Sequence, residues 1–475
     1  MPPTLLTDFS DRLSPMIVKE LRQGLRTNLF TSSFILLQGF MILTVFIGAA
    51  AEGEAGVVSG FFWFFMVATL LFAMPIRGFS SLSSEQQMNT MDLIQLTRLS
   101  AWRITFGKWA ALMSQTSLLV VSILPYLVMR YFFGGIDLVQ EFLILFSTFF
   151  GSALLTALTV GFSAFKSVLL RGFVVVAMGF VLLSVVPSLL VSRMYLGSSL
   201  FGGGITHPDF WWGVLAFVLA GLYTIYFLLD LGASQIAPLS ENHAIRKRLV
   251  ALVFMLVMLS LAFAGIDKTL VTVIATVAIV PAWVDAITER PAIVPRVLRP
   301  FAANRIYPTA KYLLTPGWHT GILYLVFTAP ILIVWLYYMT PPPASSDLLE
   351  QWALFASILG TITYPLIFIH LFIPKGKQMF GLYILIQCCT LLIASLIALV
   401  SESVSNLSDI LYYCFPVPAV SLYAISENNS PTYFLLASII FFLLSLIIPF
   451  WRALPLYKQM RLTTKTLTED TPPNS

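Results

Sequence analysis

The sequence has very little charge. Aspartate, glutamate, lysine and arginine make up 10% of its 475 residues, whereas 58% are hydrophobic and the mean hydropathy is +0.89. About a quarter of the residues of a soluble globular protein are charged, because charge keeps a surface in water. The composition therefore excludes an ordinary water-soluble fold and indicates that much of the surface faces lipid.

Cysteine and histidine are also scarce. Three cysteines cannot form a disulfide framework, and Cys388 and Cys389 lie inside an apolar run, where we interpret them as small packing residues. The four histidines are isolated from one another, with no H-E-x-x-H motif and no paired carboxylates. We expect no enzyme activity and no metal site in this chain.

The chain also lacks a phosphate-binding loop. No G-x-x-x-x-G-K-[ST] string occurs, and the nearest match, Gly161–Ser167, lacks the second glycine. We therefore expect no nucleotide cofactor in this chain. The net charge of +5 is spread over many loops, so we expect no nucleic-acid partner either.

Long apolar runs fill most of the sequence. A helix needs about 20 apolar residues to cross the hydrocarbon core, and many runs reach that length. None shows the short alternating segments of a membrane β-barrel. The sequence thus predicts an all-α, polytopic transmembrane bundle of about twelve spans in two six-helix halves. The predicted spans are 29–50, 57–76, 104–129, 142–165, 172–192, 210–231, 249–265, 270–287, 321–339, 352–373, 380–400 and 432–451.

Basic residues in the short connections predict the orientation. Arginines and lysines gather before the first span and in every second connection after it, whereas the alternate connections are acidic, neutral or hold a lone base. Basic connections stay in the cytoplasm, so both termini are expected there. Residues 410–425 are apolar but aromatic-rich and contain Pro416 and Pro418, and we interpret them as an interfacial or re-entrant piece. Counting them as a span would give thirteen helices and an external tail.

Ionisable residues are expected only near the ends of the spans. Arg130, Lys166, Asp230 and Asp285 lie there, where side chains can extend to the membrane surface. His370 is expected at the inner edge. Ion-driven carriers keep ionisable groups deep in the membrane, so this pattern weakens a carrier function.

The stretch before the first span predicts an amphipathic helix. Pro15 suits a first helical turn, and Lys19, Arg22 and Arg26 share one face opposite an apolar stripe. Such a helix lies in the membrane interface, with its bases toward anionic headgroups. An ordinary basic flank that only sets the topology is the alternative.

The long connection 77–108 is the second informative segment. It is polar up to Asn89 and then carries apolar residues from Met91 to Leu99, which predicts a short amphipathic helix at the membrane face. Apolar side chains there need a partner, which is either this chain's own bundle or a separate protein.

These two segments together resemble the permease subunits of the ABC-2 exporter superfamily. Those subunits carry an elbow helix with a P…VKELRQ…R pattern before the first span, which Pro15–Arg26 matches, with Lys19, Glu20, Arg22 and Arg26 as its charged residues. Between spans two and three they have a coupling segment of the form E…GTLDLLLLTPLS…I..GK. The matching residues here are Glu85, Thr90, Asp92, Leu93, Leu96, Thr97, Leu99, Ser100, Ile104, Gly107 and Lys108.

The match has departures and a limited extent. Asn89 replaces the usual glycine of the coupling segment and Arg98 the usual proline, which concerns local geometry more than the family. The loop after span three, with Pro125 and Gly134–Asp137, is a third similarity. The resemblance covers about residues 14–240, half of the chain.

The resemblance implies a permease subunit of an exporter in the bacterial cytoplasmic membrane. It implies a separate ABC ATPase that carries the ATP and magnesium, a second permease copy or a related permease, and membrane lipids around the bundle. The resemblance implies a cytoplasmic N-terminus with the elbow helix at 1–28 and an ABC-2-like domain at 29–240. The predicted spans and basic residues add a second half at 241–451 and a basic cytoplasmic tail at 452–475. A secondary carrier built from two six-helix halves and a non-transporting scaffold are the alternatives.

The second half repeats the helix count without the motif. Its basic connection 288–320 lies where the coupling segment lies in the first half, and it is interpreted either as a degenerate repeat or as a basic anchor. The prolines at 291, 295 and 300 predict a stiff, extended connection.

Overall fold

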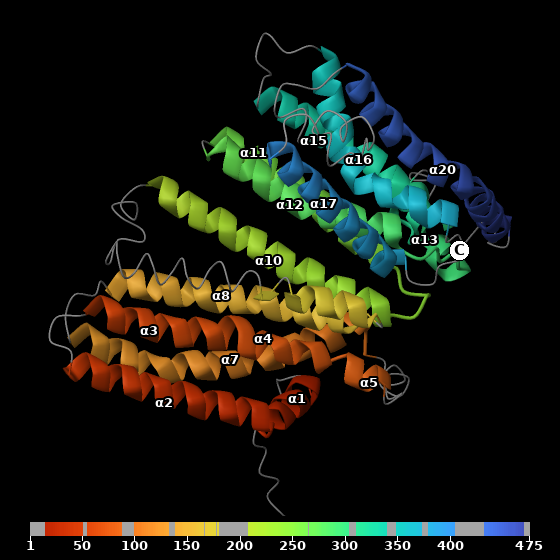
Figure 1. The fold of residues 1–475 in the computed structure, drawn as a ribbon. Coiled ribbons are helices and arrows are strands. Elements are labelled where there is room, and N and C mark those ends of the chain that lie inside the picture. The colour runs from red at the N-terminus through yellow and green to blue at the C-terminus, as the bar shows by residue number, and fades with distance from the viewer. Residues whose placement is uncertain are drawn as a thin grey trace, which may run out of the picture. The chain divides into compact units, whose positions relative to one another are not determined.

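The computed structural model is almost entirely helical in the residues that it describes. It describes residues 15–50, 55–87, 99–132, 138–165, 167–176, 178–179, 208–264, 266–303, 310–339, 348–372, 379–403 and 432–469, and no strand occurs in those ranges. The chain forms two compact units, Met1–Ala237 and Pro238–Ser475. Each unit is a bundle of long helices (Figure 1).

Unit 1 begins with a short helix at one end of its bundle. In chain order its elements are α1 (Pro15–Leu25), α2 (Asn28–Ala50), α3 (Ala55–Ala68), the π-helical turn η1 (Thr69–Ala73), α4 (Met74–Ile76), the 3-10 turn η2 (Arg77–Ser80), α5 (Ser83–Gln87), α7 (Ala101–Phe132), α8 (Leu138–Ser163) and α10 (Pro208–Ile236). Figure 1 shows α1 and α5 at the same end of the long helices.

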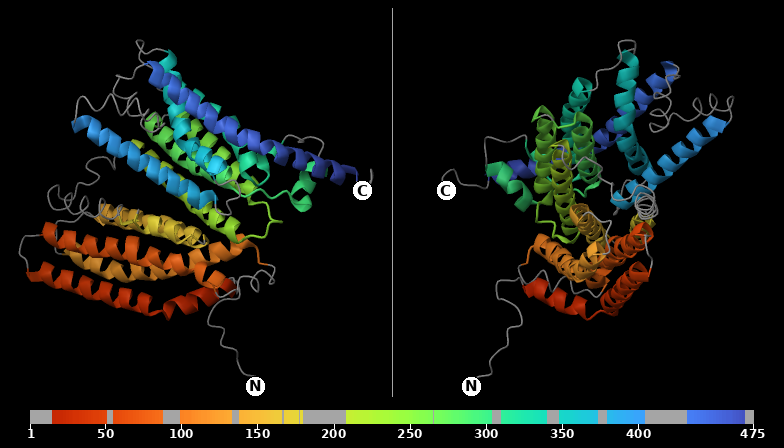
Figure 2. Two further views of the ribbon diagram at one scale, coloured as in Figure 1. Left: turned by 45° about the vertical axis from the view of Figure 1, so that its right-hand side comes forward. Right: turned by 90° about the vertical axis from the view of Figure 1, so that its left-hand side faces the viewer.

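Unit 2 is built in the same way from long helices and short connecting ones. Its elements are α11 (His243–Leu261), the 3-10 turn η4 (Ala262–Ala264), α12 (Lys268–Thr288), α13 (Pro295–Ala303), α14 (Lys311–Leu314), α15 (Trp318–Met339), α16 (Leu348–Phe372), α17 (Met379–Ser403) and α20 (Thr432–Glu469). The views in Figure 2 show α20 running along α16.

Ten helices in the described ranges are long and apolar enough to cross a membrane. Their surface fits lipid: on α2, Leu37 and Met41 are fully buried while Ile35, Leu36 and Phe46 are exposed. A helix that is apolar on its outer face as well as its inner one is stable only in an apolar solvent. The prediction of a multi-pass helical membrane protein is confirmed.

Two predicted spans, and the apolar segment 410–425, are not among those ten helices. The run 172–192 lies mostly outside the described residues, as does the segment 410–425. The run 249–265 lies in α11 and η4, and α11 is helical but carries Arg246, Lys247 and Arg248 in its first turns. Twelve spans therefore stays a prediction.

The second span contains an irregular turn. The helix changes from α to π at Thr69–Ala73, and the hydroxyl of Ser152 on α8 donates a 2.6 Å hydrogen bond to the carbonyl of Leu70. A π turn leaves backbone carbonyls with altered partners, and a side chain from a neighbouring helix can bond them. After this turn the chain stays helical through η2 and α5, so the predicted connection at 77 begins inside helical structure.

Two connections differ from the sequence-based expectation. The prediction of an extended connection is wrong for Pro295–Ala303, which form α13, because Pro295 at the first helical position needs no backbone donor. The segment 289–294 before it is non-helical, as expected. After the predicted last span, α20 continues as one helix past Trp451 to Glu469.

Glycines allow the closest helix contacts. A Cβ on Gly161 of α8 would lie 2.4 Å from the carbonyl oxygen of Leu228 on α10, and one on Gly321 of α15 would lie within 1.9 Å of the carbonyl oxygen of Ala286 on α12. In membrane bundles such small residues let helix backbones approach each other, which increases dispersion contacts.

Candidate functional site

Helix α1 has a polar face and an apolar face. Lys19, Arg22 and Arg26 are exposed, and Leu25 packs against the core formed by α2, α3 and α7. The helix therefore lies against the end of the bundle with its bases turned outward. Whether it lies in a membrane interface stays a prediction.

Three charged residues from different elements meet beside α1. The ammonium of Lys108 on α7 lies 3.0 Å from a carboxylate oxygen of Glu20 on α1 and 2.8 Å from one of Glu85 on α5. Lys108 is only 4% exposed, and the two carboxylates are 19% and 12% exposed. We call these residues the Lys108 triad. It joins α1, the segment after the second span, and the third span through one ammonium group.

A second set of contacts joins the same elements. The guanidinium of Arg77 on η2 donates to the backbone oxygen of Gly24 at 3.1 Å and to the hydroxyl of Thr27 at 3.0 Å. Gly24 lies so close to α7 that a Cβ there would be 2.0 Å from the amide nitrogen of Gln115. Helix α1 therefore packs directly on α7 at this point.

The segment that carries Glu85 is itself held by the bundle. The hydroxyls of Ser81 and Ser163 lie 3.2 Å apart, and the backbone N–H of Leu82 donates to Ser163 at 3.3 Å. Leu82 is fully buried in the core between α7, α8 and α10. These bonds fix the position of η2 and the start of α5 relative to α8.

The residues predicted from the coupling motif are only partly within the described structure. Glu85 and Lys108 form the triad with Glu20, Gly107 is buried on α7, and Leu99 is partly buried against the core of unit 1. The remaining predicted residues, Thr90, Asp92, Leu93, Leu96 and Thr97, lie outside the described residues.

Sequence reasoning missed two residues that belong to this site, Arg77 and Gln115. Their roles follow from the approach of α1, which neither spacing nor composition reveals.

A cavity lies among α1, η2, α5 and α7. Its volume is about 850 Å³, which is in the range of small-molecule sites. It is lined by Lys19, Glu20, Gln23, Gly24, Thr27, Leu29, Ile76, Arg77, Phe79, Ser80, Ser81, Ser84, Glu85, Lys108, Ala111, Leu112 and Gln115. The Lys108 triad and Arg77 thus form part of its wall.

The expectation that Arg130 extends to the membrane surface is wrong. Arg130 is 2% exposed, lies 3.4 Å from a carboxylate oxygen of Glu141 and donates to the hydroxyl of Ser59 at 2.7 Å. Its guanidinium also lies 4.2 Å from the ring centre of Phe62, and Trp63 donates to Glu141 at 3.0 Å. A buried ion pair needs such additional partners to offset its desolvation. Glu141 was not singled out from the sequence.

Asp230 and Asp285 are buried as well, contrary to the same expectation. Asp285 on α12 lies 2.6 Å from the ammonium of Lys247 on α11. That ammonium is also 3.3 Å from Glu289, whose other carboxylate oxygen is 2.8 Å from Arg248. Unit 2 therefore has a charged cluster of its own, in which bases at the start of α11 meet acids at the end of α12.

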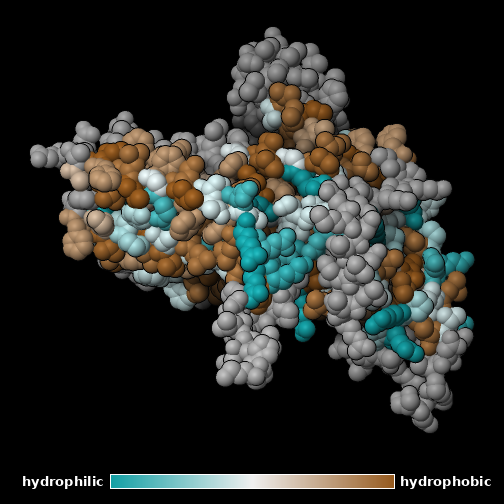
Figure 3. Space-filling model, turned by 90° about the horizontal axis from the view of Figure 1, so that it is seen from below, coloured by the Kyte–Doolittle hydropathy of each residue, from teal (hydrophilic) through white to brown (hydrophobic). Residues whose placement is uncertain are grey.

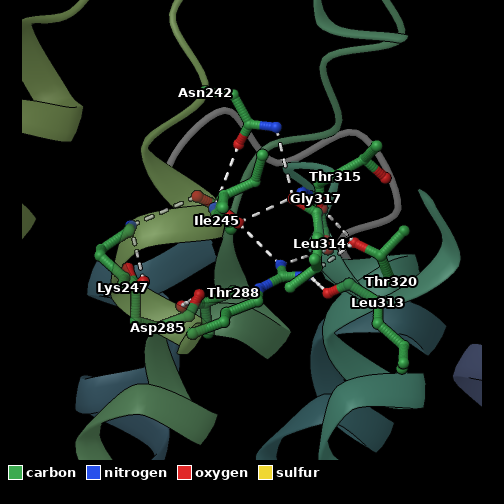
Figure 4. A network of polar contacts seen from close by, with 12 residues as sticks. Asn242, Ile245, Lys247, Asp285, Thr288, Leu313, Leu314, Thr315, Gly317 and Thr320 are labelled. Atoms are coloured by element: carbon green, nitrogen blue, oxygen red, sulfur yellow. Dashed lines mark hydrogen bonds and ion pairs between the residues drawn. The ribbon is translucent and has the colours of Figure 1, made fainter. Parts of the chain in front are cut away.

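Arg248 connects this cluster to the connection before α15. Figure 4 shows the network, with Lys247 and Asp285 on one side and Leu313, Thr315 and Gly317 on the other. One guanidinium nitrogen donates to the carbonyls of Leu313 and Thr315 and to the hydroxyl of Thr320, and the other donates to the carbonyl of Gly317. Gly317 has a φ of +141°, which L side chains rarely adopt. The cluster thus fixes a turn that only glycine forms without strain.

The surroundings of Glu289 lower the pKa of its carboxyl group. Burial alone would raise that pKa, but the positive charges of Lys247 and Arg248 and the N–H of Gly317 favour the ionised form more strongly. Glu289 is therefore ionised at neutral pH and holds both bases in place. In the part of the chain that the structure describes, no group of three His, Cys, Asp or Glu residues could hold a metal ion.

The chain has no match among family models, curated proteins or solved structures.

Proposed function

We propose that this chain is the permease subunit of an ATP-driven exporter, coupled to a separate ATPase. The observation that carries the proposal is the Lys108 triad, in which one buried ammonium joins α1, the segment that follows the second span, and the third span. The resemblance of Pro15–Arg26 and of the segment 85–108 to the ABC-2 permeases supports the same function.

The contacts of the Lys108 triad could transmit a displacement from the segment between α5 and α7 to α1. A partner that binds the apolar residues between Met91 and Leu99 would displace the segment between α5 and α7. Glu85 before this segment and Lys108 after it are bonded to each other, so a displacement of either end moves α7. The bond between Lys108 and Glu20 then passes the movement to α1. Such a continuous set of contacts can carry energetic coupling between two sites.

The remaining parts of the proposal are the orientation and the partners. We infer that α1, α5 and both termini face the cytoplasm of a bacterial inner membrane, because the basic connections lie on that side. The ATP and magnesium belong to the ATPase partner, and a second permease copy or a related permease completes the working unit. Twelve spans in two six-helix halves remain part of this proposal.

The test replaces Leu93 and Leu96 with aspartate and leaves Leu99, which packs against the core of unit 1, unchanged. The double variant is expected to insert into the membrane and to lose a co-purifying ATPase, because two charges disrupt the apolar docking face. The matched control places aspartates at Gln87 and Asn89, which adds the same charge to the same segment without removing apolar side chains. Retention of the ATPase by the leucine variant, or its equal loss from the control, contradicts the docking site.

A second experiment tests the triad as the coupling element. In Glu20→Gln/Glu85→Gln the ATPase should still bind, but hydrolysis should no longer respond to the permease, because α1 and α5 are no longer held by Lys108. Unchanged coupling between permease and ATPase would remove the main support of the proposal. Transport that stops with a protonophore and continues without ATP would instead indicate a secondary carrier.

A further inference from the structure

The cavity beside α1 has one positive charge in excess. Lys19, Arg77 and Lys108 line it together with the carboxylates of Glu20 and Glu85. Lys108 forms ion pairs with both Glu20 and Glu85. In the described residues, no ion pair joins Lys19 or Arg77 to an acidic side chain, and Arg77 donates to a backbone oxygen and a hydroxyl instead. The cavity can therefore accept one anionic group without a compensating cation.

The cavity also holds a buried polar group without a partner. Gln115 is 1% exposed, and its side-chain oxygen has no hydrogen-bond partner. Leaving such an acceptor unbonded costs about 1–3 kcal/mol, so a ligand that donates a hydrogen bond here gains more than it would at a solvated site. A hydroxyl or ammonium group supplies such a donor.

Part of the wall is apolar. Leu29, Ile76, Phe79 and Leu112 line the cavity next to the polar residues. Leu29 is exposed at the start of α2, and the apolar outer face of that helix continues from it. Figure 3 shows the hydrophilic surface gathered at the end where α1 lies and apolar surface along the long helices beside it. The cavity thus lies at the border between the two surfaces, as a lipid headgroup does.

We propose that this cavity binds one glycerophospholipid. Its phosphate diester carries the single negative charge that Lys19 and Arg77 attract, and a hydroxyl or ammonium of its headgroup donates to Gln115. Its acyl chains lie against Leu29, Ile76 and Phe79. The bound lipid fills the space between α1 and η2 and holds α1 to the bundle. This inference concerns the isolated chain and does not depend on the exporter proposal.

Native mass spectrometry of the purified chain in detergent tests the site. We expect one phosphatidylglycerol molecule to be retained at least tenfold more tightly than phosphatidylcholine, whose headgroup has no net charge and no donor. Lys19→Glu should weaken phosphatidylglycerol binding about tenfold, since a lysine near an anionic lipid contributes about 1 kcal/mol and the reversal also adds repulsion. Arg26→Glu, an exposed base beside α1 that does not line the cavity, should change it by less than about twofold.

A second pair of variants tests the cavity without changing any charge. Ala111 lines the cavity and is 2% exposed, whereas Ala110 on the same helix does not line it. Ala111→Leu should displace the lipid and Ala110→Leu should not. The proposal is overturned if Lys19→Glu and Arg26→Glu weaken phosphatidylglycerol binding equally. It is also overturned if phosphatidylcholine binds as tightly as phosphatidylglycerol, or if Ala111→Leu retains the lipid. Displacement by millimolar glycerol 3-phosphate would identify a site for free phosphate esters instead.

Discussion

Removal of the ammonium group of Lys108 should destabilise unit 1 more than any exposed substitution does. In Lys108→Met, a side chain of similar length leaves Glu20 and Glu85 beside each other without their shared cation. Breaking a fully buried pair costs about 3–5 kcal/mol. Both carboxylates here keep some exposure, 19% and 12%, and solvent screening lowers the expected cost to about 2–3 kcal/mol.

The assay is thermal unfolding of the purified chain in detergent. For a unit of this size, 1 kcal/mol corresponds to a shift of about 2–4 °C, so the midpoint should fall by about 4–12 °C. The matched control is Arg103→Met, an exposed base on the same helix, whose midpoint should move by less than about 2 °C. The triple variant Lys108→Met/Glu20→Gln/Glu85→Gln should recover most of the loss, because no uncompensated charge remains. If the single and triple variants unfold at the same temperature, the loss does not come from the carboxylates and the reasoning is wrong.

Three further predictions follow from the same geometry. Arg130→Met should destabilise unit 1 by about 3–5 kcal/mol, because Glu141 is 1% exposed and loses its cation. The double variant Arg130→Met/Glu141→Gln should lose less stability, and equal thermal midpoints for the two variants would contradict this. Gly321→Ala should lower the free energy of unfolding by at least about 1–3 kcal/mol, because its Cβ would meet the backbone of Ala286. The control Gly39→Ala, whose Cβ would have nothing within 4 Å, should be neutral or slightly stabilising in the same unfolding assay. The stability that Glu289 contributes should be present above its ordinary pKa near 4.5 and should be lost as the pH falls through its lowered pKa. Unfolding midpoints of the natural chain and of Glu289→Gln, measured from pH 7 to pH 3, should therefore converge at the acid end. A constant difference between the two midpoints would refute the assignment.

Each unit contains a cluster of buried charged residues, the Lys108 triad in unit 1 and the Lys247–Arg248 cluster in unit 2, and the two clusters are arranged differently. In unit 1 the third span supplies the cation and α1 and α5 the acids, whereas in unit 2 the bases lie at the start of α11 and the acids at the end of α12. In both, charged groups at helix ends are buried and must pair with each other, because an unpaired charge there is costly. Such pairs fix the ends of helices whose apolar faces alone would allow them to slide.

The sequence by itself determined the class of the protein and where charge could be. The scarcity of charge and the length of the apolar runs leave a helical membrane bundle as the stable solution, because every backbone polar group in lipid must be bonded within its own helix. The spacing of bases and apolar residues predicted a helix at Pro15–Arg26. The family resemblance singled out Glu20 in one motif and Glu85 and Lys108 in another, without relating the two motifs in space.

Only the tertiary structure decided which of these residues meet. Glu20 and Glu85 share one ammonium because α1 packs on α7. Arg130 is buried rather than extended because Glu141, Ser59 and Phe62 contact its guanidinium. Hydropathy measures the residue and its neighbours in the chain, whereas the burial of a charge depends on partners tens of residues away. A charged residue near the end of a span is therefore ambiguous in the sequence, and packing between helices resolves it.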